Sequence, residues 1–144
     1  MAAKDKFHNV VKSALIKDGW TITHEQFQID YGDVQMQIDL GAERLLAAEQ
    51  NGEKIAVEVK SFIAPSTIYE FHTALGQFLN YRSALRVNEP ERIPYLSVPS
   101  ETFEEFFRRR FIQEVIQEHK LNLLIYHVEQ EVIVKWIKLS STVK

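Results

Sequence analysis

The stretch that decides the fold is ERLLAAEQNGEKIAVEVK, residues 43–60. Asn51 and Gly52 at its centre favour the positive φ angles of a type I′ turn, so the flanking residues are predicted to form a tight β-hairpin. A turn centred on this pair sets Leu45 opposite Glu58. This hairpin is the best-defined element of the sequence, and the other predictions are built outward from it.

The return strand of the hairpin, residues 55–60, carries two different faces. Successive side chains of a strand point to opposite sides, so one face holds Ile55, Val57 and Val59 and the other holds Ala56, Glu58 and Lys60. Lys60 is set opposite Glu43 across the hairpin. Because the strand is short and otherwise apolar, it is predicted to lie at the centre of a sheet. Charged side chains are uncommon there unless they are paired or have a function.

Helices and further strands are predicted on both sides of the hairpin. An apolar stripe from Phe7 to Leu15, followed by Gly19, indicates an amphipathic first helix with a glycine at its end. Thr67 with Glu70, and Thr102 with Glu105, have the spacing of capping boxes. The predicted elements are a helix over 3–18, strands over 21–24, 27–31 and 35–38, the hairpin, a helix over 67–87, a strand over 94–98, a helix over 102–119, and strands over 121–128 and 131–139. This order predicts a central sheet flanked by helices, in a single domain spanning residues 1–144.

The composition fits such a domain and excludes several classes. Of the 144 residues, 45% are hydrophobic and 26% charged, which is enough apolar material for a core. The absence of cysteine excludes a disulfide framework or a cysteine-based zinc site. The N-terminus is too charged for a secretory signal, and no apolar run approaches the roughly 20 residues that span a bilayer. A cytoplasmic protein without membrane contact is expected.

Net charge argues mildly against a high-affinity DNA-binding protein, since it is −3 and a basic surplus is typical of that class. Two local basic patches are candidates for phosphate contacts. They are the lysines of the first helix (Lys4, Lys6, Lys12 and Lys17) and the run Arg108, Arg109 and Arg110. The ordinary interpretation of both patches is a solvated helix face.

Two carboxylates and a lysine are predicted to converge at one end of the hairpin. Asp39 precedes the outgoing strand and lies at the same end as Glu58 and Lys60. Carboxylates supply the hard oxygen ligands that Mg²⁺ or Mn²⁺ prefers, and the backbone carbonyl of Val59 can add another. Such a metal activates a water for phosphodiester cleavage, while Lys60 can position that water or stabilise the transition state.

The ordinary interpretation of Glu58 and Lys60 is an exposed ion pair on a solvated strand. The apolar surroundings of the strand and the acidic Asp39 upstream favour a metal site instead. Gln77 and Tyr81 add support, because side chains four apart share one helix face and can hydrogen-bond a phosphate or metal-bound waters.

The chain also resembles a known family. Asp39 with Glu58-Val59-Lys60 is similar to the core motif of PD-(D/E)XK nucleases, with Ile38 where the motif has proline, and Gln77 with Tyr81 resembles a helix motif of their Mrr-like branch. Overall the sequence resembles the XisH family of cyanobacterial fdxN-element excision controlling factors. The stretches that carry this resemblance are KDKFHNVVKSALIKDGWTIT, IDLGAERLLAAE, IAVEVKSF and ALGQFLNYRSAL.

The resemblance implies a restriction-endonuclease-like α/β fold and a role in programmed excision of a DNA element. It implies metal-ligand roles for Asp39 and Glu58, a catalytic role for Lys60, and supporting roles for Gln77 and Tyr81. DNA, a XisI-like protein and a site-specific recombinase are the implied partners, and cleavage by a homodimer is known in this fold. His8 stands where related folds often carry an acidic ligand, so a packing or surface role is expected for it.

Three functions stay open at this point. The leading hypothesis is a metal-dependent endonuclease or DNA-processing factor. Its rival is a non-catalytic regulator that uses the same fold to bind a partner or DNA, which the negative net charge favours. A defence module of the antitoxin or restriction type is suggested by the fold alone.

Overall fold

The computed structural model describes residues 3–28, 44–63 and 65–140, including their side chains except at 3–6 and 44. Asp39, Glu43 and the predicted strand 35–38 lie outside these ranges. The described elements are α1 (Ala3–Lys17), β1 (Thr21–His24), β2 (Arg44–Gln50), β3 (Glu53–Val59), α2 (Thr67–Asn88), β4 (Arg92–Pro99), α3 (Ser100–Thr102), the π-helix η1 (Phe103–Phe107), α4 (Arg110–His119), β5 (Leu123–His127) and β6 (Val132–Ile137).

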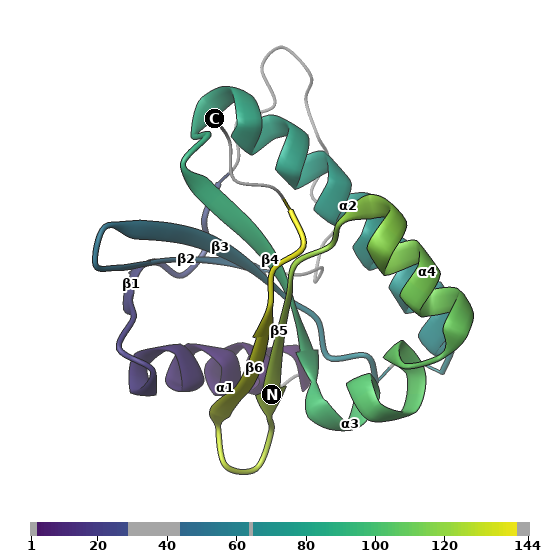
Figure 1. Cartoon of the computed structure of the whole chain (residues 1–144). Coiled ribbons are helices and arrows are strands. Elements are labelled where there is room, and N and C mark those ends of the chain that lie inside the picture. The colour runs from purple at the N-terminus through teal and green to yellow at the C-terminus, as the bar shows by residue number, and fades with distance from the viewer. Residues whose placement is uncertain (1–2, 29–43, 64, 141–144) are drawn as a thin grey trace.

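The strands form one mixed six-stranded sheet in the order β1-β2-β3-β4-β5-β6. β3, β4 and β5 are parallel to one another, because helical crossovers through α2 and through α3–α4 connect them. The remaining neighbours are antiparallel. α1 covers one face of the sheet, whereas α2 and α4 cover the other (Figure 1). The predicted central sheet with flanking helices is confirmed.

The predicted hairpin between β2 and β3 is confirmed in register and in turn geometry. Gln50 pairs with Glu53, and Leu45 pairs with Glu58. Asn51 has a φ angle of 52° and Gly52 one of 85°, as a type I′ turn requires. β3 lies between β2 and β4, so its predicted central position is confirmed as well.

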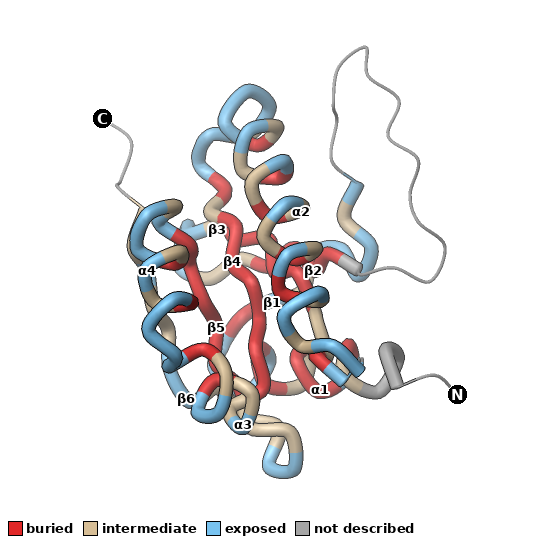
Figure 2. The backbone as a smooth tube through the Cα atoms, turned by 90° about the vertical axis from the view of Figure 1, so that its right-hand side faces the viewer, coloured by how far each residue is buried: buried red, intermediate tan, exposed pale blue. Residues whose placement is uncertain are grey.

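Two apolar clusters fill the two faces of the sheet. The cluster under α1 includes Val11, Leu15, Val57 and Tyr126. The cluster under α2 and α4 comprises Phe62, Phe71, Ala74, Phe78, Leu96, Val98, Phe103, Phe107, Ile112, Ile116, Leu121, Leu123 and Ile125. The central strands are buried along most of their length, and exposure is concentrated on the outer surfaces of the helices (Figure 2).

The end of α1 is tied to the end of β2 through Gly19. Gly19 has a φ angle of 95°, which residues other than glycine rarely adopt, and a Cβ there would collide with the Gln50 side-chain amide. That amide donates a hydrogen bond of 3.0 Å to the backbone oxygen of Asp18. The glycine predicted to terminate the first helix therefore also allows this close approach.

The predicted helix over 102–119 is wrong in one respect, because it is interrupted. η1 covers Phe103–Phe107, Arg109 is extended with a ψ angle of 144°, and α4 begins at Arg110. In a continuous α-helix, Phe107 and Ile112 would point about 140° apart. The π-turn and the break let both side chains enter the same core. Thr102 consequently lies inside the helical segment and does not cap it.

Other predicted boundaries need smaller corrections. Ser66, not Thr67, caps α2, and its side-chain oxygen accepts a hydrogen bond from the Tyr69 backbone N–H. Residues 27 and 28 are in no strand, because β1 ends at His24 after a register shift, although the Phe27 N–H donates to the Leu45 oxygen. The last two strands are shorter than predicted, since residues 121–122, 128, 131 and 138–139 lie outside them.

Candidate functional site

Glu58 occupies the carboxyl end of β3, on the sheet face covered by α2. It pairs with Leu45 on one side and Leu96 on the other, and Leu96 belongs to the same apolar cluster as Phe71 and Phe78 of α2. The Glu58 side chain is only 1% exposed. A carboxylate buried to this extent is unfavourable unless a positive charge or a metal compensates it. The prediction that this strand places charge inside the protein is therefore confirmed for Glu58.

Lys60 supplies a positive charge near the buried carboxylate. Its Nζ lies 4.0 Å from Glu58 Oε2, and its side chain is 11% exposed. The exposed ion pair that a Glu-x-Lys strand ordinarily forms is thus not what this chain has. The pair instead lies largely buried at the carboxyl end of β3.

Two buried hydroxyl groups hold the backbone around this pair. Ser97 Oγ of β4 donates a 2.9 Å hydrogen bond to the backbone oxygen of Glu58. Tyr126 of β5 donates a 3.4 Å hydrogen bond to the backbone oxygen of Lys60. Sequence reasoning missed both residues. The available signal was that Ser97 is the lone hydroxyl in the otherwise apolar segment from Leu96 to Val98.

Burial raises the pKa of the Tyr126 phenol well above its ordinary value. In the unfolded chain this phenol ionises near pH 10, whereas in the folded protein it stays protonated. Its contribution to stability is therefore intact below pH 10 and falls at higher pH, by up to about 1.4 kcal/mol per pH unit. Tyr126→Phe should flatten the loss of unfolding free energy between about pH 9 and 11, measured by urea unfolding. Equal alkaline slopes in both proteins would contradict this role of Tyr126.

Gln77 and Tyr81 lie on the buried side of α2, above the same sheet face as Glu58. Tyr81 is buried, with Phe78 and Leu85 as buried neighbours on the helix. The side-chain oxygen of Gln77 is buried and has no hydrogen-bond partner among the described residues. The two residues therefore share a helix face as predicted, and Gln77 offers an oxygen that a cation or a water could use.

The oxygen donors of the site fit a hard divalent cation. Glu58 supplies a carboxylate, Gln77 an amide oxygen and Val59 a backbone carbonyl, all ligand types that Mg²⁺ and Mn²⁺ accept. Within the described ranges, no three histidine, aspartate or glutamate side chains cluster as a metal site. Asp39, the second predicted carboxylate, lies outside those ranges, so its role stays a prediction.

The three arginines of the predicted basic patch surround the junction of η1 and α4. All three are exposed, but Arg108 pairs with Glu104 and Arg110 with Glu114 at distances of 3.2 and 3.3 Å. Arg109 donates to the backbone oxygen of Glu105. The run is thus a solvated face with two of its charges partly neutralised, away from Glu58 and Lys60 in the sequence and on a different element.

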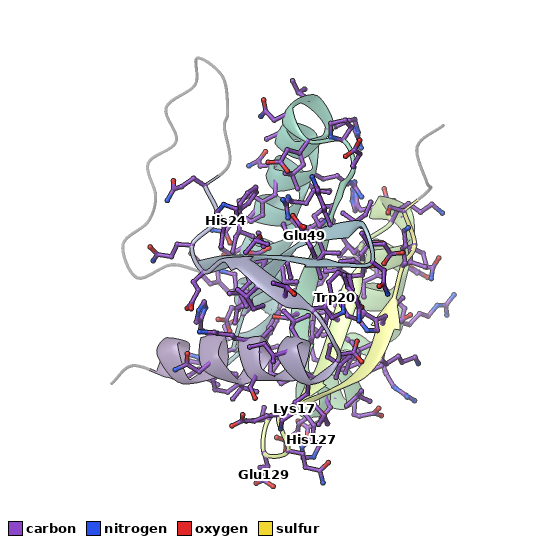
Figure 3. All side chains as sticks on the ribbon, turned by 90° about the vertical axis from the view of Figure 1, so that its left-hand side faces the viewer. Lys17, Trp20, His24, Glu49, His127 and Glu129 are labelled. Atoms are coloured by element: carbon purple, nitrogen blue, oxygen red, sulfur yellow. The ribbon has the colours of Figure 1, made fainter. Side chains whose placement is uncertain are left out.

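The lysines of the first helix also have local partners. Lys12 Nζ donates to Glu25 Oε2 at 2.5 Å, and this hydrogen bond lowers the pKa of Glu25, with His8 adding to the effect. Lys17 Nζ donates to the backbone oxygen of Gln130, which links α1 to the β5–β6 turn. Figure 3 shows Lys17 beside His127 and Glu129 at this turn. The side chains of Lys4 and Lys6 lie outside the described part of the structure.

His8 proves to be a packing residue. It belongs to α1, its side chain is buried, and its Nε2 lies 3.5 Å from Glu25 Oε1. This position is on the sheet face opposite to Glu58, and the burial of the side chain fits the packing role expected for His8. No helix in the described part of the chain is long and apolar enough to cross a membrane.

The fold and the site define a mixed α/β protein with a buried Glu-x-Lys pair at the carboxyl end of a central strand. The XisH protein family model matches residues 1–134, so the chain belongs to the XisH family. No curated protein matches the chain.

Two crystal structures are similar to this chain. An XisH family protein from Nostoc punctiforme PCC 73102 is 55% identical, with a TM-score of 0.86 over 93% of this chain and 100% of that one. A fdxN element excision controlling factor protein from Anabaena variabilis is 53% identical, with a TM-score of 0.86 over 93% of this chain and 99% of that one.

Proposed function

We propose that this XisH family protein is a metal-dependent endonuclease-type domain that acts on DNA phosphodiesters. The observation that carries the proposal is the buried pair of Glu58 and Lys60, with 4.0 Å between Oε2 and Nζ. A buried ion pair with no function could be replaced as a whole by apolar residues of similar volume at little cost in stability. The mixed sheet and the position of the pair at its carboxyl edge fit a restriction-endonuclease-like fold of the PD-(D/E)XK class.

The chain's own residues would divide the chemistry between them. Asp39 and Glu58 would hold Mg²⁺ or Mn²⁺, with the Val59 carbonyl as a further ligand. The bound metal supplies an activated water and neutralises charge on the phosphate. Lys60 orients the attacking water and stabilises the negative charge that develops on the phosphate oxygens.

Gln77 and Tyr81 have a supporting role in this proposal. Their amide and phenol can donate hydrogen bonds to a phosphate oxygen, and the Gln77 oxygen can accept one from a metal-bound water. Ser97 and Tyr126 contribute indirectly, because they fix the backbone of Glu58 and Lys60. Apart from Asp39, these residues lie on α2, β4 and β5 and at the carboxyl end of β3, so the set depends on the parallel centre of the sheet.

The biological role is inferred from the relative in Anabaena variabilis, which is named as a fdxN element excision controlling factor. We infer that this chain controls excision of a DNA element in the same way, in the cytoplasm. A XisI-like protein and a site-specific recombinase are the expected associates, and a homodimer would supply two cleavage sites. Arg108, Arg109 and Arg110 are the candidates for contacts with the DNA backbone.

A non-catalytic regulator is the second candidate, and one observation favours it. Ion pairs with Glu104 and Glu114 occupy two of the three arginines, and the net charge is −3. Both features weaken the attraction to phosphates on which a nuclease depends. In this alternative the protein binds a protein partner, and the Glu58–Lys60 pair takes no part in catalysis.

Metal binding and nicking together test the proposal. Mg²⁺ or Mn²⁺ should raise the melting temperature by mass action, and Glu58→Gln or Asp39→Ala should abolish the rise. Glu91→Gln, which alters an exposed glutamate, is the matched control and should keep it. Supercoiled plasmid should be nicked only when metal is present, with or without a XisI-like partner. Absence of nicking in every condition would favour the regulator, and an equal metal response in Glu58→Gln would reject the site.

A further inference from the structure

A groove opens at the carboxyl ends of β3, β4 and β5, with a volume of about 700 Å³. Its walls come from the segments that follow β3 and β5, from the end of β4 with α3 and η1, from Thr67 of α2 and from Phe7 of α1. In open α/β sheets ligands bind outside the carboxyl ends of parallel strands. None of Glu58, Lys60, Gln77 or Tyr81 lines this groove, so it is distinct from the site proposed for metal and phosphate.

The walls of the groove combine apolar side chains with negative charge. Phe7, Ile63 and Phe106 provide apolar surface. Glu101 and Glu105 stand on the α3–η1 side, and Glu129 belongs to the β5–β6 turn on the other side. No lysine or arginine is among the described residues that line it. A ligand complementary to these walls therefore brings positive charge together with apolar surface.

The apolar surface extends from Ile63, in the wall of the groove, to the first turn of α2. Ile63 is 58% exposed, and the preceding Phe62 is buried with a φ angle of 58°, a conformation that bulky residues rarely adopt. The loop thus turns Phe62 into the core and leaves Ile63 outside. Ile68 and Tyr69, in the first turn of α2 next to the groove residue Thr67, are also exposed. Adjacent exposed apolar side chains rimmed by charge are typical of a protein-binding surface.

We propose that this groove binds a basic, apolar segment of a partner protein. Charge complementarity selects the occupant, because the three glutamates attract lysine or arginine side chains and repel the phosphates of DNA. A second copy of this chain is a weaker candidate. Its exposed Arg108 and Arg110 already pair with Glu104 and Glu114, and the chain as a whole is negatively charged.

The test measures binding of three short fluorescent peptides by anisotropy. One alternates lysine and leucine, one replaces leucine by serine, and one replaces lysine by glutamate. The wild-type protein should bind the lysine–leucine peptide at least about tenfold more tightly than either of the others. Glu101→Gln, Glu105→Gln and Glu129→Gln combined should reduce that binding about tenfold or more, and Ile63→Ser should reduce it several-fold.

A matched triple variant separates a groove from general charge attraction. Glu104→Gln, Glu114→Gln and Glu118→Gln remove the same charge from positions outside the groove and should leave peptide binding unchanged. Equal losses in the two triple variants would overturn the proposal. If the groove variant lost binding to a short DNA duplex, the groove would be assigned to DNA and the proposal overturned. If the sedimentation coefficient of the variant alone differed from that of the wild type, the groove would be assigned to a second copy of the chain, which would also overturn the proposal. Melting temperatures verify that each variant is folded, and plasmid nicking reports separately on the proposed catalytic site.

Discussion

Lys60→Ala is expected to reduce the rate of metal-dependent plasmid nicking by about 100-fold or more, while the protein still binds the metal. Lys60 Nζ lies 4.0 Å from Glu58 Oε2, close enough to act on a water or phosphate beside a metal bound by that carboxylate. Removing a positioned positive group from a transition state typically costs a factor of this size. The variant keeps both proposed carboxylate ligands, so the rise in melting temperature with Mg²⁺ should remain.

A second lysine of the same strand provides the control for this experiment. Lys54 is half-buried near the start of β3, at the opposite end of the strand from Glu58. Lys54→Ala removes one positive charge from the same element and should leave nicking within about twofold of wild type. If Lys60→Ala nicks as fast as Lys54→Ala, Lys60 takes no part in catalysis. If Lys60→Ala also loses the metal response, the lysine acts on the binding site and not on the transition state.

Phe71→Ala is expected to lower the free energy of unfolding by about 3–5 kcal/mol, a large share of the stability of a domain of this size. Phe71 is fully buried, and its ring lies 5.5 Å from that of Phe107 and 5.9 Å from that of Phe106. The substitution leaves a cavity between α2 and η1 and removes both ring contacts. Urea unfolding measures the loss, and the melting temperature should fall by roughly 10 °C.

An exposed aromatic residue on the same helix shows whether the effect belongs to the core. Tyr69 is 69% exposed in the first turn of α2, and the Ser66 cap uses only its backbone N–H. Tyr69→Ala should change the free energy of unfolding by less than about 0.5 kcal/mol. Phe71→Leu should recover much of the stability lost in Phe71→Ala. A loss below about 1 kcal/mol in Phe71→Ala would mean that α2 and η1 do not pack as described.

The hairpin and its charged pair could be predicted because their determinants are local. The Asn51-Gly52 turn fixes the register of the hairpin. The alternation of Val57, Glu58 and Val59 fixes which face of the sheet each side chain occupies. The residues that hold the pair in place could not be predicted in the same way. Ser97 bonds to Glu58, 39 residues earlier in the sequence, and Tyr126 bonds to Lys60, 66 residues earlier. Only the sheet topology brings these residues together.

The interruption between η1 and α4 shows a different limit of sequence reasoning. Local propensity favours a continuous helix through residues 102–119, and capping-box spacing strengthens that prediction. The need to bury Phe107 and Ile112 in one core overrides it. The groove at the carboxyl edge was likewise not predicted, because its walls come from separate segments of the chain that only the sheet topology brings together.

The exposed dipeptide Asn51-Gly52 controls the site from the far end of β3. Strand side chains alternate with a period of two, so adding or removing one residue at this turn would reverse the two faces of β3. Glu58 would then point toward α1, and Val57 and Val59 would point toward α2. Inserting or deleting a single residue at the Asn51-Gly52 turn would therefore remove the Glu58 carboxylate from the site without changing any residue near it. In this family, the length of the β2–β3 turn should be as strongly constrained as the identity of the residue at position 58.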